Sequence, residues 1–163
     1  MTHRFLLTAV LLLTLALCGA GSALAAETIR GSPRVEDFDP LPLIGMDPRA
    51  ALAAFGPPRE IFPLRGLVEA EDDVVFFYDE SLYMFWYRNR VWQVRFDRRF
   101  ERRVLGLTMG MSRTEVEQAC LAPLLASGDS LYFDVEGCDC PVRARVVLDS
   151  EGVADIYVYR SDY

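Results

Sequence analysis

The sequence predicts an α+β protein made of two tandem repeats, each a helix followed by three antiparallel strands. A helix pattern that begins at Gly45 recurs without a gap at Gly110, 65 residues later. Each copy is followed by three runs typical of strands, and the strands divide into an apolar face and a mixed face. We therefore expect helices packed behind antiparallel sheets, with one merged sheet and two separate sheets as the alternatives.

The first residues predict export. Arg4 is the only fixed charge before an apolar run, Phe5–Leu17, and small residues follow up to Ala25. This pattern is typical of a secretory signal peptide cleaved near Ala25, which predicts a periplasmic or secreted protein without a transmembrane segment. A lipid anchor at Cys18 is the alternative, and we disfavour it because the residue before a lipidated cysteine is normally small, whereas here it is leucine.

Both helices carry start signals. Asp47 is a good N-cap with proline after it, and Gly56 followed by two prolines ends the first helix. Ser112 with Glu115 three residues later predicts a capping box for the second helix. The expected boundaries are 1–25 for the signal peptide, 26–43 for an extended leader without a core of its own, 44–104 for the first repeat and 105–163 for the second.

Six runs predict strands: Val74–Tyr78, the two arms of a hairpin over Leu82–Phe96, Leu131–Glu136, Arg143–Asp149 and Val153–Arg160. In Leu131–Glu136 we expect Tyr132 among the residues that point outward.

The first hairpin has two unlike faces if Asn89 and Arg90 form its loop. We expect its inward face to hold Tyr83, Phe85, Tyr87, Trp92, Val94 and Phe96. We expect its outward face to hold Met84, Trp86, Arg88, Gln93 and Arg95.

The second hairpin divides in the same way around a loop at Ser150, Glu151 and Gly152. We expect its inward face to hold Ala144, Val146, Leu148, Ala154, Ile156 and Val158. We expect its outward face to hold Arg143, Arg145, Asp155, Tyr157 and Tyr159. Both outward faces are thus rich in aromatic and arginine side chains, which predicts either a binding surface or a face covered by the leader or by the other repeat.

Composition argues against several functions. The formal net charge is −7, which disfavours nucleic-acid and anionic-membrane partners. The single histidine, His3, lies in the predicted signal peptide, so catalytic triads and histidine metal sites are not expected, and we predict no enzyme, no metal and no cofactor. The acidic run Glu69, Glu71, Asp72 and Asp73 lacks calcium-loop spacing and predicts a solvated loop.

Three cysteines follow the predicted cleavage point: Cys120, Cys138 and Cys140. An oxidising compartment favours one disulfide. Because Cys138 and Cys140 are only two residues apart, we expect Cys120 to pair with Cys138 or with Cys140.

A Gly-Met-[Ser/Thr/Asp] helix followed by strands with an Asn-Arg-Val or Glu-Gly-Val turn resembles the small outer-membrane lipoprotein A (SmpA/OmlA) module of the bacterial envelope. Two such modules in tandem resemble the β-lactamase inhibitory protein family, although the first repeat here has no cysteine. That resemblance implies sheets side by side that form a concave, aromatic-rich face gripping a protein partner. Carried over by position, the residues of that face are Met84, Trp86, Gln93, Arg95, Arg143, Arg145, Tyr157 and Tyr159.

The resemblance therefore implies an exported protein-binding module, and in particular an inhibitor of an exported enzyme. The alternative is an SmpA/OmlA-like accessory protein of outer-membrane assembly or envelope structure.

Overall fold

The computed structural model describes residues 35–66, 73–120 and 123–163, which fall in one compact unit, Val35–Tyr163. The predicted signal peptide, Cys18 and residues 26–34 of the predicted leader lie outside the described residues. So do Glu69, Glu71 and Asp72 of the predicted acidic loop. Neither α-helix of the described part has the length or the apolar run needed to cross a membrane.

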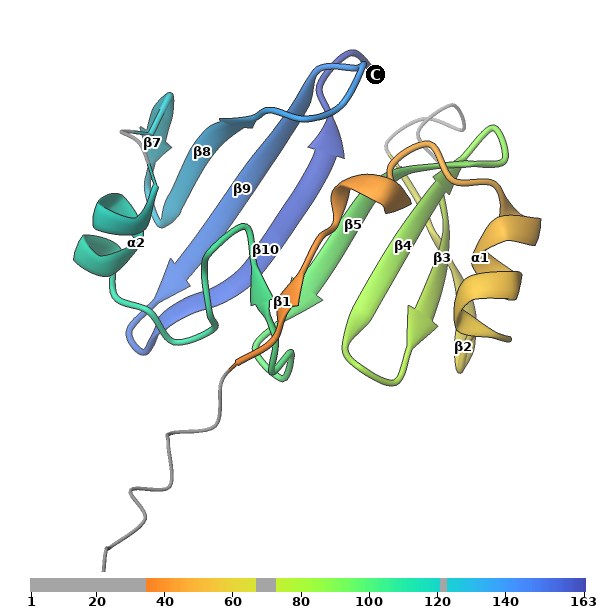
Figure 1. Cartoon of the computed structure of the whole chain (residues 1–163), viewed down its shortest axis with the longest axis horizontal. Helices are drawn as coiled ribbons and strands as arrows, with labels where there is room; N and C mark the ends of the chain where they lie inside the picture. Colours follow the sequence, from red (N-terminus) through yellow and green to blue (C-terminus); the bar gives the residue numbers. More distant parts are fainter. Residues whose placement is uncertain (1–34, 67–72, 121–122) are drawn as a thin grey trace, which may run out of the picture. The chain divides into compact units, whose positions relative to one another are not determined.

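One antiparallel sheet of eight strands dominates the described residues (Figure 1). Its strands in spatial order are β2 (Glu60–Leu64), β3 (Asp73–Tyr78), β4 (Leu82–Tyr87), β5 (Arg90–Asp97), β10 (Gly152–Arg160), β9 (Val142–Asp149), β8 (Ser130–Val135) and β7 (Leu125–Ser127).

The predicted fold class is wrong, because the described chain is mostly β. Its only α-helices are α1 (Pro48–Phe55) and α2 (Arg113–Ala119), with a short 3-10 helix, η1 (Leu41–Leu43). The hydrophobic pattern missed β2 and β7, which add a strand at each edge. In addition, β5 and β10 pair directly with each other, so a single continuous ladder replaces two helix-plus-sheet repeats.

Both predicted helix caps are confirmed. The Asp47 carboxylate accepts a hydrogen bond from the Ala50 N–H at 2.9 Å. Ser112 and Glu115 form the reciprocal capping box. Each cap satisfies N–H groups that have no partner within the helix, which sets where these short helices begin.

The two Gly-Met corners before the helices make matching backbone hydrogen bonds. In Gly45-Met46, the glycine N–H donates to Val91 O at 2.8 Å, and the Val91 N–H donates to the methionine carbonyl at 3.0 Å. In Gly110-Met111, the same two bonds form with Val153, at 2.9 and 2.8 Å. Each corner thereby fastens the start of a helix to one of the two central strands, β5 or β10.

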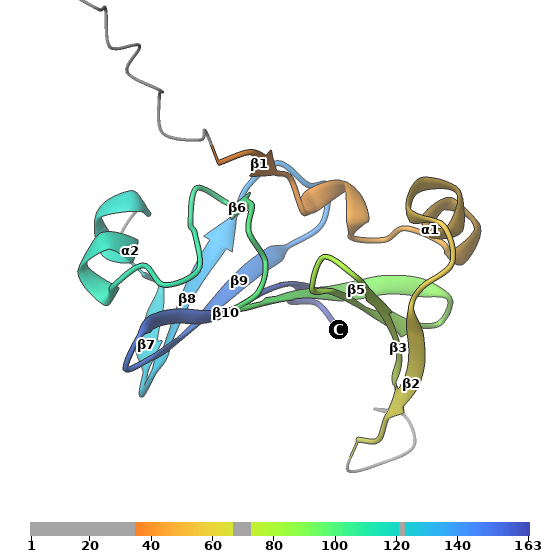
Figure 2. The same ribbon diagram turned by 90° about the horizontal axis from the view of Figure 1, so that it is seen from below.

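The helices lie on one side of the sheet. Figure 2 shows α1, α2 and the small parallel pair β1 (Asp37–Phe38) and β6 (Arg103–Val104) on that side. Ala51 of α1 and Val116 of α2 are fully buried there. The sheet contributes apolar side chains to the same core, among them Met84, Trp86, Phe96, Leu131, Val146, Ile156 and Val158.

Part of the predicted leader, which was expected to have no core of its own, packs on this common core. Leu43 is buried, and the Phe38 ring packs on Phe96 with ring centroids 5.4 Å apart. The described residues 35–43 therefore pack on the helix side of the sheet, and their backbone runs between the two helices (Figure 2).

The faces of the first hairpin were predicted wrongly. Its turn is Arg88–Asn89, with φ values of +48° and +59°, so Tyr87 pairs with Arg90 instead of Trp92, and beyond the turn Phe85 pairs with Gln93 instead of Val94. The changed register places the side chains of β4 on the face opposite to the expected one. Met84 and Trp86, expected outward, are 0% and 6% exposed in the core.

The other strand of this hairpin contains a β-bulge. The pairs Phe85–Gln93 and Trp86–Val91 leave Trp92 as the extra residue. The bulge restores the predicted inward position of Val94 and Phe96, which are fully buried, and turns Trp92 outward.

The second hairpin follows its prediction closely. Arg145 pairs with Tyr157, Arg143 with Tyr159, and Val146 with Ile156. The one error in its inward face is Ala154, because an irregularity between Val153 and Asp155 buries Val153 instead.

Candidate functional site

The face of the sheet opposite the helices carries a row of aromatic and arginine side chains. We call this side the helix-free face, since no described helix packs on it (Figure 2). Six neighbouring strands, β3, β4, β5, β10, β9 and β8, contribute one residue each, and each residue lies opposite the next one in the pairing of the strands. The row consists of Phe77, Tyr83, Arg95, Tyr157, Arg145 and Tyr132.

Neighbours in this row contact one another. The rings of Phe77 and Tyr83 have centroids 4.7 Å apart. The Arg95 guanidinium lies 4.9 Å from the Tyr83 centroid and 5.7 Å from that of Tyr157. The Arg145 guanidinium lies 5.6 Å from the Tyr157 centroid and 6.0 Å from that of Tyr132. These are cation–π distances, so stacking holds the side chains of the row in place.

Arg95 is also fixed by an ion pair. Its Nε donates to Asp155 at 2.7 Å and its Nη2 lies 2.6 Å from the same oxygen, with the arginine side chain 30% exposed. Burial disfavours the charged guanidinium, but the Asp155 carboxylate outweighs this and raises the pKa of Arg95. Arg95 therefore presents a permanently charged, planar group in one orientation.

A second carboxylate, Asp97, anchors Tyr83. The Tyr83 hydroxyl donates to Asp97 Oδ2 at 2.9 Å, and Arg99 donates to the same carboxylate from its side chain and its backbone N–H. Burial opposes the ionisation of Asp97, but these hydrogen bonds prevail and lower its pKa to about 2. Tyr83 thus has a fixed hydroxyl as well as a stacked ring.

A shorter second row runs beside the first. It pairs Gln93 with Tyr159, Tyr159 with Arg143, and Arg143 with Asp134. The Arg143 Nε donates to Asp134 at 3.1 Å. Burial raises the pKa of Tyr159. The two rows together extend the aromatic and arginine surface along the strands.

Six of the eight residues expected in a binding face lie on this side: Gln93, Arg95, Arg143, Arg145, Tyr157 and Tyr159. Met84 and Trp86 do not, because the first hairpin has the other register. Sequence reasoning placed Tyr83 in the core and left Phe77 and Tyr132 out of the site. The outward position predicted for Tyr132 was a signal for including it.

The cysteines do not pair as expected. Cys120, Cys138 and Cys140 are all free thiols, and the bridge predicted from Cys120 is not formed. Instead the Sγ atoms of Cys138 and Cys140 lie 2.7 Å apart. Gly137, just before Cys138, has a φ of +104°, a backbone conformation that L side chains rarely adopt.

Among the described residues, no group of three or more Cys, His, Asp or Glu side chains is arranged to hold a metal ion. The chain matches no protein-family model, no curated protein and no solved structure.

Proposed function

We propose that the protein is an exported binding module that captures a protein partner on its helix-free face, and that inhibition of an exported enzyme is the specific form this takes. The observation that carries the proposal is the row of six aromatic and arginine side chains across neighbouring strands. The signal-peptide pattern at the start of the sequence supports export.

The chemistry of the row suits protein recognition. Tyrosine and arginine are enriched among the residues that dominate interface energies, because they combine a large contact area with a polar group. Stacking and ion pairs already order Arg95 and Tyr83, so little conformational entropy remains to be lost on binding.

The shape of the sheet adds to this. Figure 2 shows the end of the sheet formed by β2 and β3 bending toward the helix-free side. A curved sheet with ordered aromatic groups on its inner curve fits a convex protein surface better than a flat one.

The test compares captured proteins for the wild type and for single variants of the row. Immobilised protein is exposed to envelope and culture-fluid extracts. Tyr157→Ala and Arg145→Ala should each weaken capture of the same partner by about 2 kcal/mol, or roughly 30-fold in affinity. Arg113→Ala, an exposed arginine on α2 at the other face, is the matched control and should capture normally.

A measurement of stability separates lost binding from lost folding. Thermal unfolding midpoints should stay close to the wild-type value, since Arg145 is exposed and Tyr157 half-buried. The proposal fails if every captured protein binds the row variants and the wild type equally well.

A further inference from the structure

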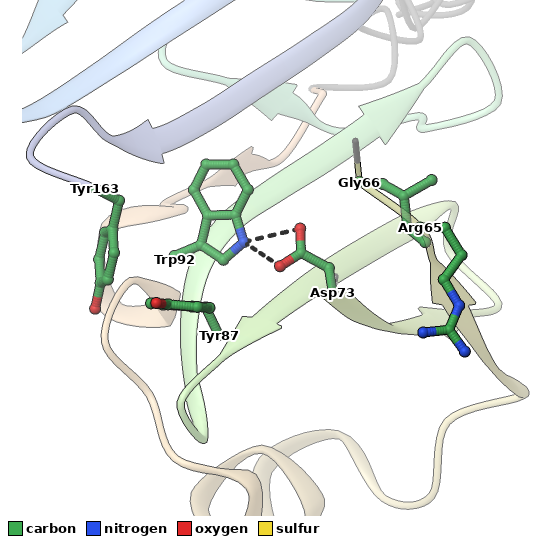
Figure 3. Close-up of a pocket in the computed structure, with 7 residues that line it drawn as sticks. Arg65, Gly66, Asp73, Tyr87, Trp92 and Tyr163 are labelled. Atoms are coloured by element: carbon green, nitrogen blue, oxygen red, sulfur yellow. Dashed lines mark hydrogen bonds between the residues drawn. The ribbon is translucent and has the colours of Figure 1, made fainter. Parts of the chain in front are cut away.

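A cavity of about 490 Å³ opens on the helix-free side, apart from the aromatic and arginine rows (Figure 3). Three of its walls are aromatic: Tyr87 from the end of β4, Trp92 from the bulge of β5, and Tyr163 beyond β10. The remaining lining residues are Leu64, Arg65, Gly66 and Asp73.

The three rings form a corner instead of a parallel stack. Tyr87 and Tyr163 meet at an interplanar angle of 87° with centroids 5.5 Å apart. Trp92 and Tyr163 meet at 54° with centroids 6.4 Å apart. Because the faces of aromatic rings carry partial negative charge, a corner of this kind offers several such faces to one bound group.

Asp73 fixes the indole and adds negative charge. The Trp92 Nε1–H lies 3.2 Å from both Asp73 oxygens, and Asp73 is only 8% exposed. In Figure 3 the Asp73 carboxylate and Tyr163 lie on opposite sides of the Trp92 indole, and Arg65 lies beyond the carboxylate, farther from the rings. A carboxylate in a poorly hydrated place acts more strongly on a nearby charge than one in water.

Two arginines show that these rings attract cations. Arg88 lies 5.1 Å from the Tyr87 centroid, and Arg160 lies 4.7 Å from that of Tyr163. Neither of these two arginines lines the cavity, and Arg65, which does, lies farther from the rings than Asp73 does (Figure 3).

We propose that this cavity binds the methylated ammonium group of an organic cation. Aromatic corners with a carboxylate nearby suit quaternary ammonium groups, whose charge is spread over methyl groups that need no hydrogen-bond acceptors. A primary ammonium ion is more strongly hydrated and loses more on entering a pocket lined mainly by rings. The inference is independent of the proposed capture of a protein partner, because it uses none of the residues of the two rows.

The test is a titration of the purified protein with choline. The Trp92 indole N–H, followed by NMR, reports binding, because Trp92 lines the cavity and its N–H donates to Asp73. We expect a dissociation constant on the order of 1 mM for so small a ligand. The neutral carbon analogue of choline, 3,3-dimethylbutan-1-ol, should bind at least about fivefold more weakly, because it lacks the charge.

Variants separate the cavity from the rest of the face. Tyr163→Ala, at a residue 55% exposed, should weaken choline binding by about two- to fivefold, and Tyr163→Phe should retain it. Asp73→Asn keeps an acceptor for the indole and should weaken binding by on the order of tenfold. Tyr132→Ala, an aromatic truncation on β8 outside this cavity, is the control and should bind as the wild type does.

Butylammonium, which has the primary ammonium group of a lysine side chain, tests whether the cavity prefers a methylated ammonium group. Weaker binding of butylammonium than of choline supports the methylated group, and tighter binding of butylammonium overturns that choice. Equal binding of choline and its neutral analogue overturns the cation site altogether, as does choline binding that Tyr163→Ala and Tyr132→Ala leave equally unchanged.

Discussion

The β5–β10 pairing divides the sheet into two halves. They have the same backbone hydrogen bonds at their helix starts but different side chains in the core. Each half has a Gly-Met corner bonded to its central strand and a capped helix behind it. The first half packs aromatic groups under α1, as in the pair Phe76–Trp86 with centroids 4.9 Å apart. The second half fills the same side with Val146, Ile156 and Val158. Backbone hydrogen bonds therefore define the frame, and the side chains in each half adapt to it.

The largest expected effect tests the register of the first half. Trp86→Ala removes a buried indole from the core and should lower the free energy of unfolding by about 3–5 kcal/mol. Tyr87→Ala, the next residue and half-buried on the other face, should cost clearly less. Denaturant unfolding measures both. The opposite order would mean that the hairpin has the register expected from its sequence pattern.

The second prediction concerns the corner of the second half. Gly152 has φ of +102°, and a Cβ there would lie 2.6 Å from the Met111 carbonyl oxygen and also against the backbone of Gly110. Gly152→Ala should therefore destabilise the protein by about 2–4 kcal/mol. Gly128→Ala is the matched control: its φ is +56° but its surroundings are open, so it should cost about 1 kcal/mol. Equal losses for the two variants would show that the corner has room.

The third prediction uses pH. The pKa of Asp97 is about 2 in the folded protein, against about 3.9 for an unfolded aspartate. A lowered folded-state pKa stabilises the protein above the unfolded value, and this contribution disappears as the pH falls from about 4 through 2. At neutral pH, Asp97→Asn should lose about 1–2 kcal/mol, reduced from the full linkage value because Arg99 is largely exposed.

The pH curve itself provides the check. The stability difference between the wild type and Asp97→Asn, measured by urea unfolding, should shrink between about pH 4 and pH 2. Asp134→Asn removes an exposed carboxylate paired with Arg143, and should change stability by no more than about 0.5 kcal/mol. A difference for Asp97→Asn that is constant over this range would contradict the assignment.

The smallest effects compare the two helix caps. Asp47→Ala and Ser112→Ala each leave N–H groups of a first helical turn without a partner, and each should cost about 1 kcal/mol. Thr114→Ala lies within α2, is exposed, and should be neutral or slightly stabilising in thermal unfolding. A cap variant without effect would show that its helix is held by packing alone.

The two hairpins show why sequence reasoning succeeded in one half and failed in the other. In β9, arginines alternate with Ala144 and Val146, so only one register buries apolar groups, and its facing was predicted correctly. Every side chain of β4, Leu82–Tyr87, is apolar or aromatic, so either face could be buried. The choice depended on a turn at Arg88–Asn89 and on the bulge at Trp92, which no alternation reveals.

The prediction of the candidate site likewise succeeded in the second half and failed in part in the first half. Residues of the second half in the predicted binding face, Arg143, Arg145, Tyr157 and Tyr159, were identified from alternation alone. The prediction for the first half was partly reversed. Tyr83, expected in the core, lies on the helix-free face, whereas Met84 and Trp86, expected on the binding face, are buried. The cavity was not foreseen at all, because its walls come from β2, β3, β4, β5 and the segments after β2 and β10, which only the folded sheet brings together.

The sequence by itself determined the local features of this protein: the caps at Asp47 and Ser112, the Gly-Met corners, and most strand positions. These depend on groups only a few residues apart, whose hydrogen bonds form wherever the chain is placed. Tertiary structure decided the joining of β5 to β10 and the register of β4. In those cases several local solutions are nearly equal in energy, and burial of the common core selects one.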